Sequence, residues 1–134
     1  VAYEDLYAGA RATVTADEVD RAGVLLDARA PERFRGEVEP VDAVAGHIPG
    51  ARNAPSTGLL SSDGALQSES ELTALFADRG VDAHSDVAVY CGSGVTAAVV
   101  IAGLASVGVD AALFPGSWSQ WSSESSRPVA VGEG

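Results

Sequence analysis

The sequence of 134 residues contains no lysine, no methionine and only one cysteine, Cys91. One cysteine cannot form an intramolecular disulfide, so the chain is not a disulfide-stabilised scaffold, and a reducing, cytoplasmic setting is expected. Two histidines, His47 and His84, accompany it, and these three side chains are fewer than the four ligands of a structural zinc site. We therefore predict no metal and no cofactor.

Long apolar stretches and positive charge are also scarce. No hydrophobic run approaches the roughly 20 residues that a membrane-spanning helix needs. The chain starts at Val1 without a basic and then apolar leader, which predicts a processed chain or a fragment of a longer protein. The formal net charge of −11 argues against binding to nucleic acid or to an anionic membrane, because both require basic side chains.

Every basic residue is an arginine, and half of them lie close together in the sequence. The clustered arginines are Arg29, Arg33, Arg35 and Arg52. Such a cluster could hold a small anion, since a guanidinium group pairs with a carboxylate through two parallel hydrogen bonds. Salt bridges within the same stretch are the alternative, and their acidic partners would be Glu32, Glu37, Glu39 and Asp42.

Short apolar segments alternate along the chain with segments of helical periodicity. The predicted strands cover residues 24–28, 51–55, 86–90 and 111–114. The predicted helices cover residues 15–22, 68–80 and 95–107, and capping boxes start the first two. This alternation predicts an α/β fold with a mainly parallel central sheet of about five short strands, flanked by helices on both faces.

The length of the chain fits a single domain. We expect that domain to cover residues 15–125. Residues 1–14 would form a linker or lead-in, and residues 126–134 a flexible tail rich in Ser, Glu and Gly.

The strand predicted at 86–90 runs directly into Cys91, and a glycine-rich loop and a helix follow. Ligands of open α/β sheets bind at the C-terminal ends of strands, which is where Cys91 falls. The loop amides could surround the sulfur with N–H donors, and the helix N-terminus adds partial positive charge. Both features favour a thiolate over a thiol. A buried structural cysteine that closes a core strand is the alternative.

The residues of the loop after Cys91 suit an arrangement of N–H donors around the sulfur. Gly92 and Gly94 permit the positive φ angles that a tight turn over the sulfur needs. Ser93 and Thr96 carry hydroxyl groups that would face the same space, and the helix would begin near Val95.

The segment Cys-Gly-Ser-Gly-Val-Thr-Ala at 91–97 resembles the active-site loop of the rhodanese family, in the form carried by 3-mercaptopyruvate sulfurtransferases. Three other stretches agree with this resemblance and occur in the family's order. They are Asp27–Arg29 with Arg33–Gly36, then Gly46–Asn53, then Gly116–Trp121. Together they span most of the chain, and the last is similar to an element near the end of the catalytic domain of two-domain members.

The resemblance implies a rhodanese-like fold and a sulfurtransferase that works through a persulfide on Cys91. Sulfur would pass from 3-mercaptopyruvate or thiosulfate to a thiol or to cyanide. Ser93 would polarise the donor or relay a proton, and the amides of Gly92, Gly94, Val95 and Thr96 would stabilise the anionic sulfur. Arg33 would hold the carboxylate of the donor.

Two features of the sequence bear on the choice of donor. Mercaptopyruvate enzymes often carry a second arginine just past the Arg-Phe-Arg-Gly element, where this chain has Val41. Thiosulfate-preferring members tend to have basic residues directly after the cysteine, where this chain has Gly92 and Ser93. The first feature counts against mercaptopyruvate. The second counts against thiosulfate, because a dianion would be held less well without basic residues. On balance we expect mercaptopyruvate to be the better donor.

Four further residues near the expected site receive structural interpretations. Asp27 and Arg29 follow a buried strand and would form an internal salt bridge. His47 would be a hydrogen-bonded structural histidine. Trp118 would anchor the core or an interface, with a wall of the substrate pocket as the alternative.

Two rival functions make different demands on the sequence. A phosphatase on the same fold needs an arginine six positions after the cysteine, where this chain has Ala97. A non-catalytic rhodanese module that carries a persulfide or binds a partner stays open. The resemblance also implies that an N-terminal rhodanese domain is missing from this chain. We then expect weak turnover and an open face around Cys91.

Overall fold

The computed structural model describes residues 10–19, 22–40, 42, 44–61, 64–82, 85–91, 96–124 and 126–132. Its five strands form one sheet in the order β1-β5-β4-β2-β3, and every pairing is parallel. The strands are β1 (Ala10–Thr13), β2 (Val24–Asp27), β3 (Arg52–Asn53), β4 (Val87–Tyr90) and β5 (Ala111–Leu113). The predicted parallel sheet of about five short strands is confirmed.

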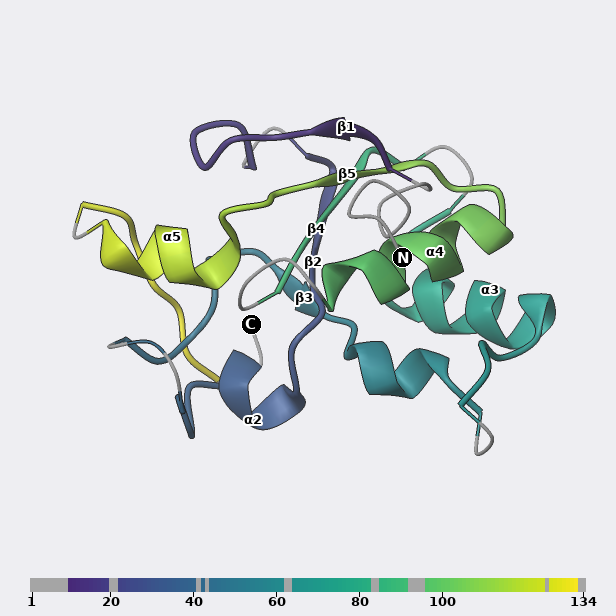
Figure 1. Ribbon diagram of the computed structural model, residues 1–134, viewed down its shortest axis with the longest axis horizontal. Coiled ribbons are helices and arrows are strands. Elements are labelled where there is room, and N and C mark those ends of the chain that lie inside the picture. Colours follow the sequence, from purple (N-terminus) through teal and green to yellow (C-terminus); the bar gives the residue numbers. More distant parts are fainter. Residues whose placement is uncertain are drawn as a thin grey trace.

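Helices cover both faces of this sheet, as predicted. They are α2 (Pro31–Phe34), the 3-10 helix η2 (Ser56–Leu59), α3 (Glu69–Asp78), α4 (Ala97–Ser106) and α5 (Ser117–Ser123). Figure 1 shows α3 and α4 packed side by side, with α5 at the opposite end of the view beyond the strands.

The two faces arise from the alternation of side chains along each strand. On one face, Leu26, Val89 and Leu113 join a buried cluster with side chains of α3 and α4. On the other face, Leu25 and Tyr90 join a second cluster, which contains Phe34, Trp118 and Trp121. Apart from Asp27 at the end of β2, the central strands β2, β4 and β5 are therefore apolar on both faces, as expected where helices cover both sides of a parallel sheet.

Helix α3 forms where its capping box predicts it. The N–H of Glu71 donates to Ser68 Oγ at 3.3 Å, and the Ser68 hydroxyl donates to the Glu71 carboxylate at 2.8 Å. Leu72 and Phe76 are buried on the inner side. Gly80, at φ +82°, ends the helix in the left-handed conformation that glycine adopts without steric cost.

The segment predicted as a helix at 15–22 differs in the structure. Among its described residues, 16–18 form a turn, and the N–H of Thr15 donates to Glu18 Oε1 at 2.9 Å. A single capped turn that no longer helix follows forms few hydrogen bonds, and these do not offset the conformational entropy lost when its backbone is fixed. The opposite case is α5, which was not predicted because a serine-rich stretch carries little helical signal.

Two segments that lie outside the predicted domain of residues 15–125 pair with it in the structure. Strand β1 lies within the expected lead-in and pairs with β5, which places it at the edge of the sheet. The expected tail packs onto the domain: Ala130 and His47 exchange backbone hydrogen bonds of 2.9 and 2.8 Å, and the N–H of Gly132 donates to Arg35 O. Both β1 and residues 130–132 form backbone hydrogen bonds with segments distant in sequence, which local composition does not reveal.

The C-terminal segment 128–132 crosses Gly46 at a distance that only glycine allows. Gly46 has φ +129°, and a Cβ atom there would meet Ala130 O and lie 2.7 Å from Val129 Cγ1. Gly50 also has a positive φ, +87°, but a Cβ atom there would meet no atom within 4 Å. A comparison of substitutions at the two glycines therefore separates the energetic cost of a positive φ from the cost of steric overlap.

Replacement of Gly46 by alanine is expected to lower the free energy of unfolding by about 3 kcal/mol, from backbone strain plus overpacking. The matched variant Gly50→Ala carries the strain alone and should cost about 1–2 kcal/mol. Urea unfolding curves of both variants measure the difference. Equal losses would show that the contact between Gly46 and the C-terminal segment has no energetic weight.

Candidate active site

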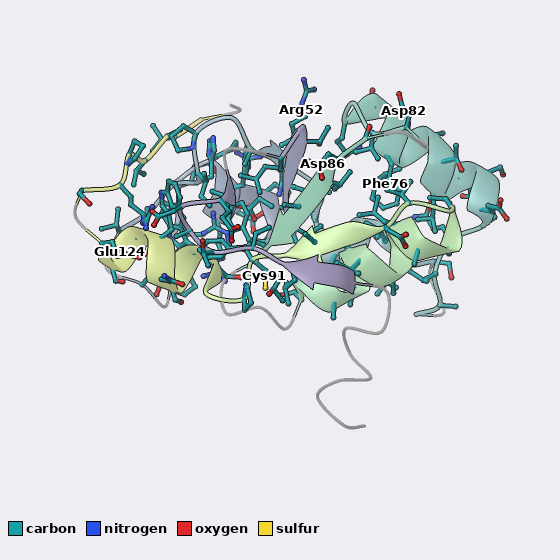
Figure 2. All side chains as sticks on the ribbon, turned by 90° about the horizontal axis from the view of Figure 1, so that it is seen from above. Arg52, Phe76, Asp82, Asp86, Cys91 and Glu124 are labelled. Carbon is teal, nitrogen blue, oxygen red and sulfur yellow. The ribbon has the colours of Figure 1, made fainter. Side chains whose placement is uncertain are left out.

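Cys91 lies immediately beyond the C-terminal end of β4. Its side chain has the same parity along the chain as Val87 and Val89, so it faces the side of the sheet that α4 covers. It belongs to the same buried cluster as Ala97, the first residue of α4. In both views the end of β4 lies between the facing ends of α5 and α4, and Figure 2 marks the Cys91 sulfur there.

The residue is fully buried, with 0% of its surface exposed. Strand alternation turns its side chain inward against α4. The open face expected around Cys91 stays a prediction, because residues 92–95 lie outside the described residues. Burial alone is equally consistent with a structural cysteine, so the chemistry must be decided by the surroundings of the residue.

Both peptide groups of Cys91 are bound by the beginning of α5. The Cys91 N–H donates to Ser117 Oγ at 3.1 Å, and the Cys91 carbonyl accepts from the Trp118 N–H at 2.8 Å. The Ser117 hydroxyl in turn donates to Phe114 O at 2.9 Å, at the end of β5. The backbone of Cys91 is thereby fixed from the neighbouring strand.

Asp27 and Arg29 form the predicted internal salt bridge at the end of β2. The guanidinium of Arg29 donates to Asp27 Oδ2 at 2.7 Å and to Gly46 O at 2.6 Å. The Asp27 and Arg29 side chains are essentially inaccessible. Arg29 also lies over the ring of Trp118, 4.9 Å from its centroid, which joins this pair to the turn that holds Cys91.

The charges of this pair alter the ionisation of their neighbours. Burial alone would lower the pKa of Arg29, but the hydrogen bond and negative charge of Asp27 outweigh it, so the pKa of Arg29 is raised. The pKa of Tyr90 is raised well above its ordinary value of 10.0, first by burial and then by the charge of Asp27. The Tyr90 oxygen accepts from the Ile48 N–H at 3.0 Å.

The raised pKa of Tyr90 predicts a loss of stability in alkali. A folded state that holds a proton more tightly than the unfolded chain keeps this contribution fully below pH 10.0 and loses it as the pH rises further. In urea unfolding between pH 8 and 11, the wild-type protein should lose stability faster than Tyr90→Phe above pH 10. Parallel curves for the two proteins would contradict this assignment.

Arg33, the predicted substrate-binding residue, lies on α2 beside two carboxylates. Its guanidinium is 3.1 Å from Glu39 Oε2 and 3.9 Å from Asp42 Oδ2, and its side chain is 21% exposed. Glu39 also approaches Arg29 at 3.5 Å. Within the described chain these arginines thus have the salt-bridge partners named as the alternative to a bound anion, and a donor carboxylate must compete with Glu39.

His47 is buried and lies against α2. Its Nδ1 is 2.7 Å from the carbonyl oxygen of Phe34, which can only accept, so Nδ1 carries the proton. The imidazole stacks on the ring of Phe34 at 3.8 Å between centroids. Nε2 is buried and has no hydrogen-bond partner among the described residues. These contacts agree with a structural histidine.

Several predicted site residues lie outside the described part of the chain. They are Gly92, Ser93, Gly94 and Val95 of the loop. Val41 and His84 also lie outside it. Thr96, the last loop residue, is described: it is exposed and is the N-cap residue of α4. The helix N-terminus therefore follows Cys91 as predicted.

Ser117 was missed by the sequence interpretation. It is fully buried and is the single non-glycine residue with positive φ, +54°, in the described chain. A signal was available, because Pro115 and Gly116 end the strand β5, and the C-terminal ends of parallel neighbours meet at the same edge of a sheet. Glu39, which contacts both Arg29 and Arg33, was considered only as a generic salt-bridge partner.

Neither a metal centre nor a membrane segment is apparent in the described residues. No three His, Cys, Asp or Glu side chains gather there so as to hold a metal ion. No helix in that part of the chain has the length and apolar character to cross a membrane.

The fold and the site define an α/β domain with a buried cysteine at the C-terminal end of a central parallel strand, one loop before a helix. The chain belongs to the rhodanese family: the family described as "Rhodanese-like domain" matches residues 11–124. That range includes residues 11–13 of β1, which precede the domain start predicted from the sequence.

Relatives with curated names agree with this family. The chain is 60% identical over 133 residues to a protein of Mycobacterium tuberculosis named "Putative thiosulfate sulfurtransferase SseB", which covers 98% of this chain and 47% of the relative. It is 49% identical over 114 residues to the "Probable 3-mercaptopyruvate sulfurtransferase" of Pseudomonas aeruginosa, covering 81% and 39%. The chain thus spans about half the length of the relatives it matches, or less.

Solved structures share the same fold. An anaerobic ergothioneine biosynthesis enzyme from Chlorobium limicola, in complex with trimethyl histidine, superposes with a TM-score of 0.82. The alignment covers 90% of this chain and 32% of that one, at 24% sequence identity. At this identity the likeness concerns the fold alone.

Proposed function

We propose that this chain is a catalytic sulfurtransferase domain that carries sulfur as a persulfide on Cys91. The observation that supports the proposal most is the position of Cys91 at the end of β4, directly before the loop and helix α4, in a rhodanese domain. The names of the M. tuberculosis and P. aeruginosa relatives give thiosulfate and 3-mercaptopyruvate as candidate donors.

The reaction consists of two displacements at sulfur. The Cys91 thiolate attacks the sulfur of mercaptopyruvate, a new S–S bond forms, and the C–S bond breaks to leave a pyruvate enolate that takes up a proton. With thiosulfate the S–S bond of the donor breaks and sulfite leaves. A thiolate or cyanide then attacks the outer sulfur, which restores the Cys91 thiolate and yields a new persulfide or thiocyanate.

The loop residues and Arg33 have separate tasks in this proposal. The amides of Gly92, Gly94, Val95 and Thr96 stabilise the anionic sulfur, and Ser93 polarises the donor or relays the proton. Arg33 exchanges its contact with Glu39 for the carboxylate of mercaptopyruvate, because a guanidinium group binds either carboxylate in the same manner.

The variant Arg33→Ala tests the donor assignment. With cyanide as acceptor, we expect KM for mercaptopyruvate to rise by about tenfold or more and KM for thiosulfate to change much less, since only the former offers a carboxylate. Arg52→Ala is the matched control, because Arg52 is exposed and lies on the edge strand β3. Equal changes for both donors, or for both variants, would reject a specific role of Arg33.

A second candidate function is a persulfide carrier or partner-binding module without turnover of its own. It is favoured by the full burial of Cys91 and by the extra length of the relatives, which leaves room for a second, N-terminal rhodanese domain that would complete the site. The reduced cytoplasm suits either function, since a persulfide-forming thiol must not be lost to oxidation. Absence of turnover with either donor, with or without an N-terminal half added in trans, would support this second function, whereas weak turnover that rises on that addition would support an incomplete enzyme.

A further inference from the structure

The backbone N–H and carbonyl of Cys91 form hydrogen bonds with residues that are distant in sequence. Its N–H donates to a side chain, Ser117 Oγ, and its carbonyl accepts from the next residue along, Trp118. Both partners are 26 or more positions away, at the start of α5. Ser117 and Trp118 are each fully buried, so water does not replace these bonds.

Ser117 occupies its position at a conformational cost. Its φ of +54° lies in the left-handed region, which non-glycine residues rarely adopt. Strain of this kind persists only where the surroundings fix it, and it concentrates at functional sites. The strained turn directs Ser117 Oγ between two backbone groups: the carbonyl of Phe114, to which it donates, and the N–H of Cys91, from which it accepts.

We infer that Ser117 is a positioning residue for Cys91. It fixes the backbone of the cysteine so that the sulfur faces the beginning of α4, where partial positive charge stabilises a thiolate. This inference rests on the proposed function in one respect, since the sulfur is taken to be a nucleophile. It adds a group from β5 and α5 to a site otherwise built from the loop that joins β4 to α4.

The hydroxyl group and the backbone conformation of Ser117 can be tested separately. Ser117→Ala removes Oγ and keeps the strained φ, whereas Ser117→Gly removes Oγ and also relieves the strain. The glycine variant should therefore be the more stable of the two in urea. Ser122→Ala is the matched control, because the Ser122 hydroxyl lies on the same helix and donates to Trp118 O at 2.7 Å.

The first measurement is the single-turnover rate of persulfide formation with mercaptopyruvate. We expect Ser117→Ala and Ser117→Gly to lose about ten- to a hundredfold in the rate constant at saturating donor, since misplacement by about 1 Å has such effects. The donor concentration at half-maximal rate should stay the same. A wild-type rate in the glycine variant would show that only the backbone conformation matters and would overturn the inference.

The second measurement does not depend on sulfur transfer. Cys91 is the only thiol, so alkylation by iodoacetamide reports on it alone. The pH at which alkylation reaches half its maximal rate should move upward in both Ser117 variants and stay unchanged in Ser122→Ala. This midpoint does not depend on how often the buried cysteine becomes accessible to the reagent, whereas the maximal alkylation rate at high pH does. Unchanged midpoints in both variants would reject the positioning role. If the wild type forms no persulfide but the midpoints move, the proposed function fails and the positioning role stands.

Discussion

Replacing Cys91 by serine will abolish sulfur transfer by this chain. A hydroxyl group at this position cannot form a persulfide, so the covalent intermediate is lost, and we expect kcat to fall by at least about a thousandfold. The measurement is formation of thiocyanate from mercaptopyruvate and from thiosulfate, with cyanide as acceptor. Serine is close to cysteine in size, so the domain should remain folded despite the buried position.

The control for this variant is structural. Circular dichroism and urea unfolding should show that Cys91→Ser keeps the secondary structure of the wild type and most of its stability. Residual turnover within tenfold of the wild type, in a folded variant, would mean that the sulfur is carried elsewhere or that the donor reacts directly with the acceptor.

Replacing Asp27 by alanine will cause the largest loss of stability among the charged residues of the site. It leaves the Arg29 guanidinium buried without the carboxylate that it contacts at 2.7 Å, and such changes typically cost about 3–5 kcal/mol. The midpoint of urea unfolding should fall accordingly, with little change in the slope. The loss should extend to the site, because Arg29 also binds Gly46 O and lies over Trp118.

Asp17→Ala is the matched control for this prediction. Asp17 pairs with Arg127 at 2.9 Å, but its side chain is 86% exposed. Exposed pairs contribute about 1 kcal/mol or less, so this variant should remain close to the wild type. If the two aspartate variants lost equal stability, burial of the Asp27–Arg29 pair could not be the cause.

The sheet and the position of the cysteine could be predicted from the sequence because both depend on local patterns. Val87–Tyr90 is a short apolar run that ends at Cys91, and its helix follows after a loop with two glycines. The capping box at Ser68 specifies α3 in the same local way. Alternation of such segments was sufficient to predict a parallel sheet covered on both faces.

Other parts of the fold depend on pairings that no local pattern encodes. The segment Ala10–Thr13 has the sequence Ala-Arg-Ala-Thr, which contains no bulky apolar residue, and it joins the sheet through β5, about a hundred positions later. Residues 128–132 belong to the predicted tail, and they pack against Gly46 and His47. The role of Ser117 also depends on a pairing distant in sequence. Its hydroxyl reaches the backbone of Cys91 because β5 lies beside β4 in the sheet.

The most direct test of the central claim is the intact mass of the chain after incubation with mercaptopyruvate and removal of the excess donor. We predict an added mass of about 32 Da, one sulfur atom on one cysteine, that disappears on treatment with cyanide and never forms on Cys91→Ser. The same experiment with thiosulfate compares the donors. An unchanged mass with both donors, on folded protein, would contradict the assignment of Cys91 as the sulfur-carrying nucleophile.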